Sequence, residues 1–424
     1  MLVQFSVKNF MSFKEKVIFT MQAGSGNENE LNIIEANNTN ERILKTAAIY
    51  GANASGKTNL IKAFSAAIFM IRKSSSRQVG EKLLEMTPFA FDEKTIKEPC
   101  EFEFIFISNG IKYDYGFSAD KDKVYEEYLY QYLSAKPTRI FERENVNEYK
   151  FIQSDEGKLN TIKSQNTENK LFLSTATMWN YPKTKDAFLW FAQNIDTYLG
   201  GVISNEKSIE AYGNDEKEEL KKFTLRLLKE ADIFIKDFEV EVKEENLDND
   251  IVLLINGKNV QTMGTKKKNA KIKMIHEIKD DKGETRNYEL NYTNESLGTQ
   301  VIFSFAPILK NAFENGNVVI IDEIERSLHP TLVEMIINFF HNSKINKKNA
   351  QLIFSTHDTN LLSLDLFRRD QIWFAEKDIK KGATDIYPLD DFSVRKTENI
   401  QKGYLNGRYG AIPFVATGNS LWED

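Results

Sequence analysis

The sequence is poor in cysteine and histidine. Among its 424 residues there is one cysteine, Cys100, and there are four histidines. A single cysteine cannot form an internal disulfide, so the chain suits a reducing compartment. The histidines and the cysteine have no metal-ligand spacing between them, which argues against a structural zinc site.

Long apolar runs and an excess of basic residues are also missing. No stretch approaches the roughly 20 apolar residues that a membrane helix needs, and the N-terminal segment lacks the apolar core of a signal peptide. We therefore expect a soluble, cytoplasmic protein that does not bind membranes. The formal net charge of -6 argues against a general nucleic-acid coat, so any nucleic-acid contact would be local.

The first motif that is present is GANASGKT, Gly51 to Thr58, which matches the P-loop pattern G-x-x-x-x-G-K-[ST] in full. An apolar segment before it predicts a buried strand, and apolar residues at helical spacing follow it. Its glycines let backbone N–H groups turn toward phosphate oxygens beside the positive end of the helix. We expect Lys57 to reach the β- and γ-phosphates and the Thr58 hydroxyl to ligate Mg²⁺. The predicted nucleotide-binding residues of the loop are Gly51, Asn53, Ala54, Ser55, Gly56, Lys57, Thr58 and Asn59.

A second motif, NVVIIDEIERSLHP, runs from Asn317 to Pro330. Apolar β-branched residues come directly before Asp322 and Glu323, which predicts a strand covered on both faces. Side chains alternate along a strand, so the two carboxylates are expected to point opposite ways at its C-terminal end. Asp322 would then hold the Mg²⁺ shell, while Glu323 faces an attacking water as general base. The alternative is a strand that ends in two solvated acids.

The stretch QLIFSTHD, Gln351 to Asp358, predicts another apolar strand that leads to His357. A lone histidine at a strand end is more often structural than catalytic. Here the strand is expected beside the previous one at the same sheet edge, where the imidazole could hydrogen-bond the γ-phosphate or the attacking water. We therefore take His357 as a catalytic candidate together with Glu323 and Lys57.

The order of these motifs resembles that of ABC-type ATPase heads in the RecF, SMC and OLD-like branch. The elements that carry the resemblance are the P-loop, SLGTQ at 296–300, the two carboxylates followed by SLHP at 327–330, and the strand that leads to His357. The opening KNFMSF, Lys8 to Phe13, is also similar to that branch. The overall size and the segment ENIQKGYLNGRYGAIPFV, Glu398 to Val415, are similar to bacterial abortive-infection ATPases of the AbiL/RloA type. Those are anti-phage proteins that generally act with a separate effector protein.

The resemblance implies an α/β fold, namely an ABC-type P-loop ATPase head with a mixed sheet, flanking helices, an antiparallel β subdomain and a compact α/β insertion. It also implies ATP and Mg²⁺ as cofactors and a homodimer or higher homo-oligomer, in which the signature segment of one head closes over nucleotide held by another. Ser296 and Gly298 would supply the hydroxyl and the close backbone approach to that γ-phosphate. SLGTQ departs from the transporter pattern LSGGQ, and a simple helix N-cap at Ser296 is the alternative. The glutamine loop of the family is expected near 85–94, where no Gln stands.

The spacing of the motifs constrains the domain organisation. Because Asp322 and Thr58 must meet at one metal, the chain between them has to leave the core and return. We therefore expect one ATPase head over residues 1–424. Its predicted parts are an N-terminal lobe at 1–180, a mainly helical insertion at 181–234, and a second part at 235–424 that carries the signature, the carboxylates, the histidine and the tail.

Four further patterns concern the surface and the insertion. Alternating apolar and polar residues predict antiparallel strands in 100–134, and strands return after 235. Sustained heptads are absent, which argues against a long SMC-like coiled-coil arm. The lysines of TKKKNAKIK, Thr265 to Lys273, predict a solvated hairpin tip, with a phosphate-binding tip as the alternative. The aromatic and basic tail at 395–415 fits either a partner-docking surface or packing onto the head.

The leading functional hypothesis is a nucleotide-gated switch. ATP would join two heads, the joined form would hold or sense something, and hydrolysis or a trigger would release it. The protein would be the sensor or regulatory ATPase of a bacterial anti-phage system. After His357 there is no suitable spread of acidic residues for the metal-dependent nuclease domain of OLD-type relatives, so a separate effector of nuclease or toxin type is expected. The alternative is a RecF/SMC-like DNA-repair ATPase that clamps nucleic acid.

Overall fold

The computed structural model describes the chain except for residues 37–38, 40, 201–209, 216, 247–251, 256–257, 262–265, 280 and 414–424. Within 243–270 it describes the backbone of the other residues but not their side chains. The chain divides into two compact units. The first holds Met1–Gly201, Ala312–Arg326 and Val333–Asp424, and the second holds Val202–Asn311 and Ser327–Leu332.

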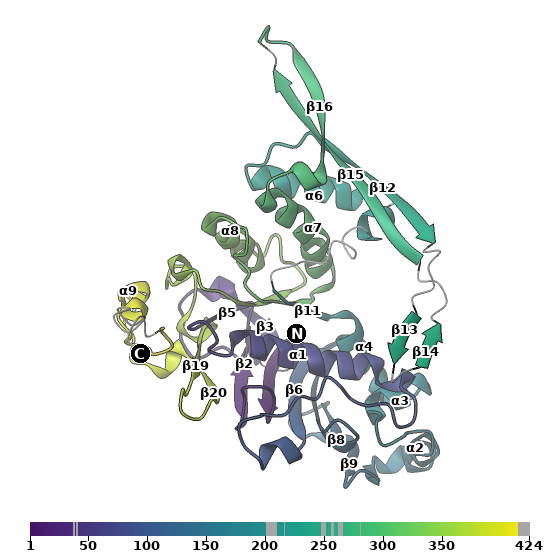
Figure 1. The fold of residues 1–424 in the computed structure, drawn as a ribbon. Helices are drawn as coiled ribbons and strands as arrows, with labels where there is room; N and C mark the ends of the chain where they lie inside the picture. The colour runs from purple at the N-terminus through teal and green to yellow at the C-terminus, as the bar shows by residue number, and fades with distance from the viewer. Residues whose placement is uncertain are drawn as a thin grey trace, which may run out of the picture. The chain divides into compact units, whose positions relative to one another are not determined.

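The first unit contains a seven-stranded antiparallel sheet (Figure 1). Buried residues alternate with less buried ones along several of its strands, as predicted. The strands are β1 (Leu2–Lys8), β2 (Val17–Thr20), β6 (Cys100–Ser108), β7 (Ile111–Ala119), β8 (Val124–Tyr132), β9 (Thr138–Glu144) and β10 (Glu148–Phe151). Their order is β10-β9-β8-β7-β6-β1-β2. Asn109 and Gly110 both have positive φ, 50° and 77°, and close the β6–β7 hairpin. The antiparallel strands predicted in 100–134 are confirmed.

A second sheet of the same unit carries the motifs. Its strands are β5 (Thr46–Tyr50), β11 (Ile195–Tyr198), β17 (Val318–Ile321), β18 (Gln351–Ser355), β19 (Ile372–Lys377) and β20 (Thr384–Pro388). The order is β11-β17-β18-β5-β19-β20, and all neighbours pair in parallel except β19 with β20. Every residue of β5, β17 and β18 is buried, as expected for strands covered on both faces. The carboxyl ends of these three strands therefore meet at one edge of the sheet.

Helix α1 (Lys57–Lys73) packs its apolar side against the antiparallel sheet. The ring of Phe64 stacks on Phe5 of β1, with 3.8 Å between ring centroids. Helix α4 (Pro182–Gln193) joins this core, because Phe191 lies edge-on to Phe104 at 5.0 Å. The unit also contains the paired strands β3 (Ile33–Ala36) and β4 (Glu41–Leu44), helices α2 (Glu156–Lys163), α3 (Phe172–Met178) and α9 (Ile400–Leu405), and most of α8 (Pro330–His341).

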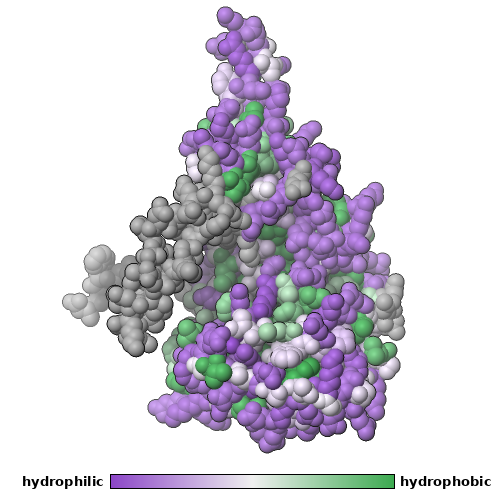
Figure 2. Space-filling model, turned by 90° about the vertical axis from the view of Figure 1, so that its right-hand side faces the viewer, coloured by the Kyte–Doolittle hydropathy of each residue, from purple (hydrophilic) through white to green (hydrophobic). Residues whose placement is uncertain are grey.

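The second unit combines helices with a β-ribbon. Its elements are α6 (Glu219–Glu230), most of α7 (Leu297–Asn315), β12 (Asp237–Asn246), β13 (Val252–Ile255), β14 (Lys258–Gln261), β15 (Lys266–Lys279) and β16 (Thr285–Asn291). The ribbon has the antiparallel order β12-β15-β16, and its surface is mainly hydrophilic in Figure 2. The Tyr212 ring stacks on Phe303 of α7 at 4.5 Å, and its hydroxyl donates to the Phe303 oxygen at 3.0 Å. The longest helix in the described part of the chain is α7, with 19 residues, so the extended element seen here is a ribbon and not a coiled coil.

Two expectations about the chain between the P-loop helix and the signature segment differ from the structure. The predicted helical insertion at 181–234 does not coincide with the second unit, since α4 belongs to the core of the first. The predicted hairpin tip in the lysine cluster is wrong for residues 266–273, which lie in β15; Thr265 is outside the described residues. The register places Lys271 opposite Glu241 and Lys273 opposite Glu239 of β12. Opposite charges across the ribbon account for Lys271 and Lys273 without a phosphate ligand.

Candidate nucleotide-binding site

The loop that joins β5 to α1 is a tight turn that depends on two glycines. Gly51 has φ 155° and Gly56 has φ 113°. A Cβ at Gly51 would lie 2.4 Å from the Ala375 oxygen, and a Cβ at Gly56 would lie 2.4 Å from Thr384 Oγ1. Inside the turn, Ser55 is buried and its hydroxyl has no partner among the residues that the structure describes. The turn leads into the first N–H groups of α1, so the loop suits phosphate oxygens.

The Lys57 side chain folds back over this loop. Its ammonium donates to the Gly51 oxygen at 2.8 Å and to the Ala52 oxygen at 3.0 Å, and the residue is only 5% exposed. Burial lowers the pKa of Lys57 to about 8, against the opposing effect of nearby carboxylates. The structure thus holds the predicted phosphate-binding cation inside the turn.

Thr58 and Asp322 meet although they are 264 positions apart in the sequence. Thr58 Oγ1 lies 3.3 Å from Asp322 Oδ1. Ser355 Oγ donates to the same carboxylate oxygen at 2.6 Å, and Asp322 is buried. A hydroxyl beside a carboxylate is the oxygen-donor chemistry that Mg²⁺ prefers. These residues therefore fit the metal that the sequence predicts, with Ser355 as the group that orients Asp322.

Glu323 reaches the site for a different reason from the one expected. Strand β17 ends at Ile321, and Glu323 has a left-handed backbone with φ 53°. Its N–H donates to Ser355 Oγ at 2.8 Å, which fixes the turn. The alternation of side chains along a strand is thus the wrong explanation. A strained turn, held by Ser355, separates Glu323 from Asp322.

His357 follows the end of β18 at the same sheet edge. Its N–H donates to Glu325 Oε1 at 2.7 Å, and its side chain is exposed. Burial of part of the ring and the charge of Lys57 lower the pKa of His357 below its ordinary value of 6.5. The imidazole is therefore neutral at pH 7 and can accept or donate one hydrogen bond near the loop.

The structure adds residues that the motifs did not single out. Asn59 Nδ2 donates to Ser12 Oγ at 2.8 Å. Thr384 Oγ1 lies 2.9 Å from Ser12 Oγ and donates to the Ser55 oxygen at 2.8 Å. Ser12 belongs to the KNFMSF segment. The family resemblance of that segment could therefore have indicated that Ser12 lies near the loop. Nothing in the sequence around Thr384 indicates its contact with the loop.

The signature segment lies in the second unit. Ser296 is exposed, and its Oγ accepts from the Thr299 N–H at 3.1 Å, so it is the N-cap of α7. Gln300 Nε2 donates to the Glu295 oxygen at 2.9 Å and closes the same turn. A Cβ at Gly298 would lie 3.3 Å from the Ser327 oxygen, which gives this glycine a packing role within its own unit. The N-cap alternative is therefore observed, and an exposed cap remains free to take a second role.

The described part of the tail packs onto the first unit. The rings of Tyr404 and Tyr409 both stack on Phe374 of β19, at 5.4 and 5.8 Å. The Tyr404 hydroxyl donates to the Ala411 oxygen at 3.0 Å. Residues 411–413 then line a cavity of about 380 Å³ together with the loop residues Ala52 to Ser55. Of the two interpretations of the tail, packing onto the head holds up to residue 413; the rest of 395–415 lies outside the described residues.

Residues 47–363 match a family model described as "AAA domain, putative AbiEii toxin, Type IV TA system". The chain belongs to this AAA-domain family. The matched range contains most of strand β5, the P-loop, Asp322 and Glu323, the signature segment and His357. The predicted ABC-type P-loop ATPase head with an abortive-infection link is confirmed, and so is the mixed α/β fold with its antiparallel sheet.

Solved structures with low sequence identity are similar over most of the chain. One is an SmcHead bound to the C-winged helix domain of ScpA, with 11% identity and a TM-score of 0.41 over 91% of this chain and 97% of that chain. Another is the SMC head domain from Thermotoga maritima, with 15% identity and a TM-score of 0.39 over 91% of this chain and 98% of that chain. A third is an Smc head domain with an extended coiled coil bound to the C-terminal domain of ScpA, derived from Pyrococcus furiosus, with 11% identity and a TM-score of 0.39 over 96% of this chain and 98% of that chain. No curated protein matches the chain. Across the described residues, we find no helix with the length and apolar character to span a bilayer.

Proposed function

We propose that the protein is an ATP-hydrolysing switch that dimerises around ATP and regulates a separate effector protein in bacterial anti-phage defence. The observation that carries this proposal is the contact of Thr58 with Asp322 at 3.3 Å, beside the buried ammonium of Lys57. A phosphate loop alone binds many ligands, but a loop joined to a buried carboxylate at the metal position is the arrangement that nucleoside-triphosphate hydrolysis requires.

The residues divide the chemistry among themselves. The turn from Gly51 to Lys57 would bind the phosphates, and Thr58 with Asp322 would hold Mg²⁺. When bound, Mg²⁺ neutralises charge on the phosphate oxygens. Glu323, half-buried at the same edge, would accept a proton from the attacking water. The neutral imidazole of His357 would orient that water or the γ-phosphate.

Dimerisation is proposed from the position of the signature segment at the surface. Ser296 is exposed at the start of the 19-residue helix α7, where its hydroxyl and the first N–H groups of the helix would form an anion site. In a dimer, this helix start of one copy would face the γ-phosphate held by the loop of the other. Exposure supports the proposal because a buried serine could not serve a second copy.

The effector is proposed to be another polypeptide, of nuclease or toxin type. The family description names a toxin and a type IV toxin–antitoxin system. In this chain, the residues described after His357 form β19, β20 and α9, and these pack onto the head. These elements thus stabilise the ATPase head, which supports the proposal that a separate partner protein carries the effector activity.

Two substitutions test the hydrolytic part. Lys57→Ala should abolish ATP binding, while Glu323→Gln should keep ATP binding and lose turnover, as measured by calorimetry and phosphate release. Glu156→Gln is a matched control, since it makes the same chemical change at an exposed glutamate of α2 and leaves the proposed base in place. Hydrolysis that persists in Glu323→Gln would refute the assignment of the base. Strong stimulation by DNA with a steep salt dependence would indicate the nucleic-acid clamp instead.

A further inference from the structure

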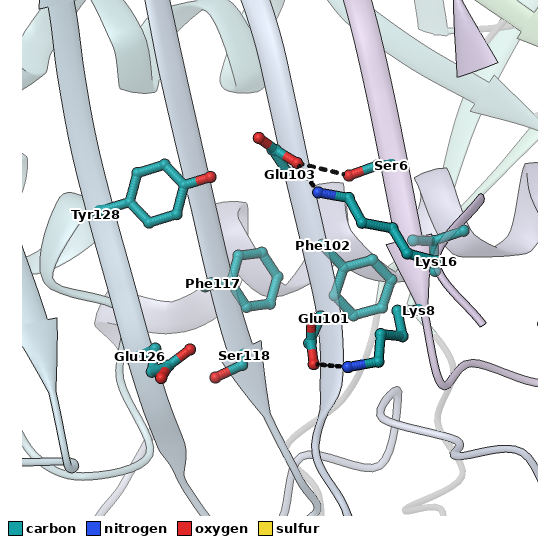
Figure 3. A pocket seen from close by; sticks show the side chains of 11 residues that line it. Ser6, Lys8, Lys16, Glu101, Phe102, Glu103, Phe117, Ser118, Glu126 and Tyr128 are labelled. Carbon is teal, nitrogen blue, oxygen red and sulfur yellow. Dashed lines mark hydrogen bonds and ion pairs between the residues drawn. The ribbon is translucent and has the colours of Figure 1, made fainter. Parts of the chain in front are cut away.

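The outer face of the antiparallel sheet carries cross-strand rows of polar side chains. One row runs Lys8, Glu101, Ser118 and Glu126, because these residues are register partners on β1, β6, β7 and β8. The next row runs Ser6, Glu103, Gly116 and Tyr128 on the same four strands. The rows line a groove of about 200 Å³, shown in Figure 3.

A glycine in the middle of β7 sets the position of one ring that lines the groove. Gly116 pairs with Tyr128 on β8 and with Glu103 on β6. A Cβ at Gly116 would lie 2.6 Å from the Tyr128 ring, so glycine is the residue that lets this ring lie against the sheet. The Tyr128 side chain then lines one side of the groove.

The charges around the groove do not balance. Lys8 pairs with Glu101 at 2.7 Å, and Lys16 pairs with Glu103 at 2.6 Å. Glu126 is exposed and has no ion pair among the residues that the structure describes. Beside the groove, Asp114 also lacks an ion pair within the described residues, and its Oδ1 is buried without a hydrogen-bond partner. The groove region therefore carries more negative than positive charge.

A second and independent observation comes from Ser118, which lies in the row between Glu101 and Glu126. The residue is 4% exposed, and its Oγ has no hydrogen-bond partner among the described residues. It lines the groove, next to Glu126 in Figure 3. Buried hydroxyls are normally satisfied, so an orphaned one in an acidic groove indicates that a donor group belongs there.

We propose that this groove binds the guanidinium group of an arginine on a partner protein. Ser118 Oγ, Glu126 and Glu101 offer oxygen acceptors along one line, and a planar guanidinium carries five N–H donors that can meet several of them at once. The excess negative charge selects a basic group and rejects phosphate or an acidic peptide. The groove lies on an extended sheet, so a segment of a partner can lie across the rows.

The probe for this proposal is a fluorescein-labelled peptide with three arginines separated by glycines, followed by fluorescence anisotropy. The control peptide carries citrulline, which keeps the shape of arginine and removes its charge. Glu126→Gln should weaken binding of the arginine peptide about 2- to 5-fold, as expected for one exposed ion pair, and Glu126→Lys should weaken it about tenfold or more. Ser118→Ala should weaken it several-fold without a change in charge.

Glu156→Lys on α2 makes the same change in net charge at an exposed site away from the groove. This variant should bind the arginine peptide like the wild type. Equal binding of the citrulline peptide would overturn the proposal, and so would an equal loss of binding in Glu156→Lys and Glu126→Lys. A wild-type affinity weaker than about 1 mM for the arginine peptide would overturn it as well. Because Glu126 is exposed, its variants should keep the thermal unfolding midpoint of the wild type, which separates lost binding from lost folding.

Discussion

Substitution of Ser355 by alanine removes one hydroxyl from the centre of the site. Ser355 Oγ donates to Asp322 Oδ1 at 2.6 Å and accepts from the Glu323 N–H at 2.8 Å. The Ser355 hydroxyl therefore orients Asp322 by a contact with its carboxylate and Glu323 by a contact with its backbone N–H. The Ser355 hydroxyl bonds to Asp322 and Glu323, whereas Lys57 bonds to the loop. Removal of the hydroxyl should therefore affect turnover more than nucleotide binding.

The magnitude follows from the two hydrogen bonds. A bond to a charged group contributes about 1.5–3 kcal/mol, and a bond between neutral groups contributes about 1 kcal/mol. Since Ser355 and Asp322 are both buried, water cannot easily replace the lost hydroxyl. We expect Ser355→Ala to lower the free energy of unfolding by about 2–4 kcal/mol. If the bond to Asp322 is needed in the transition state, kcat should fall about 10- to 100-fold.

Urea denaturation measures the first effect, and steady-state phosphate release at saturating ATP measures the second. Ser363→Ala is the control, because Ser363 caps a nearby turn by accepting from the Asp365 N–H at 3.1 Å and lies outside the site. That variant should lose less than about 1 kcal/mol of stability and keep its activity. The reasoning is wrong if Ser355→Ala folds with the stability of the wild type and hydrolyses ATP at an unchanged rate.

Two other predictions concern the loop. Burial lowers the pKa of Lys57 from 10.5 to about 8 in the free protein, and phosphate binding favours the ammonium form. ATP affinity should therefore fall as the pH rises through 8. Calorimetry should show binding about tenfold weaker at pH 9 than at pH 7. Adenosine, which has no phosphates, should show no such dependence, and a flat ATP profile would contradict the assignment. Gly56→Ala should destabilise the protein by about 1–3 kcal/mol in urea and weaken ATP binding, because its Cβ would meet Thr384 at a strained φ. Gly157→Ala, where a Cβ meets nothing within 4 Å, should be neutral or stabilising, and equal losses in both variants would refute the steric argument.

The sequence was sufficient for those parts of the site that depend on local patterns. The P-loop sequence predicts its turn because Gly51 and Gly56 are the residues that tolerate the close approach of Ala375 and Thr384. The apolar runs before Asp322 and before Ser355 predict buried parallel strands, and parallel strands bring their carboxyl ends to one edge. From these local rules, the meeting of Thr58 with Asp322 could be expected.

The remaining features depend on contacts between distant segments. Ser355 stands in an apolar strand like any strand serine, and only the register of β17 against β18 sets it beside Asp322. Thr384 follows no motif, and it meets the loop because β20 pairs with β19 next to β5. The lysines of 265–273 look like a loop because charge clusters are common there, yet the cross-strand glutamates let Lys271 and Lys273 lie in a ribbon. The sequence also could not predict that α4 belongs to the first unit. An amphipathic pattern shows which face of a helix is buried but not which element covers that face.

The most direct test of the central claim is the mass of Glu323→Gln in solution, measured by light scattering with and without ATP and Mg²⁺. A nucleotide-gated switch predicts that ATP at least doubles the mass of this variant, and that a second substitution, Ser296→Arg, prevents the increase while ATP still binds. A mass that stays the same at saturating ATP would contradict the claim that two copies close around the nucleotide.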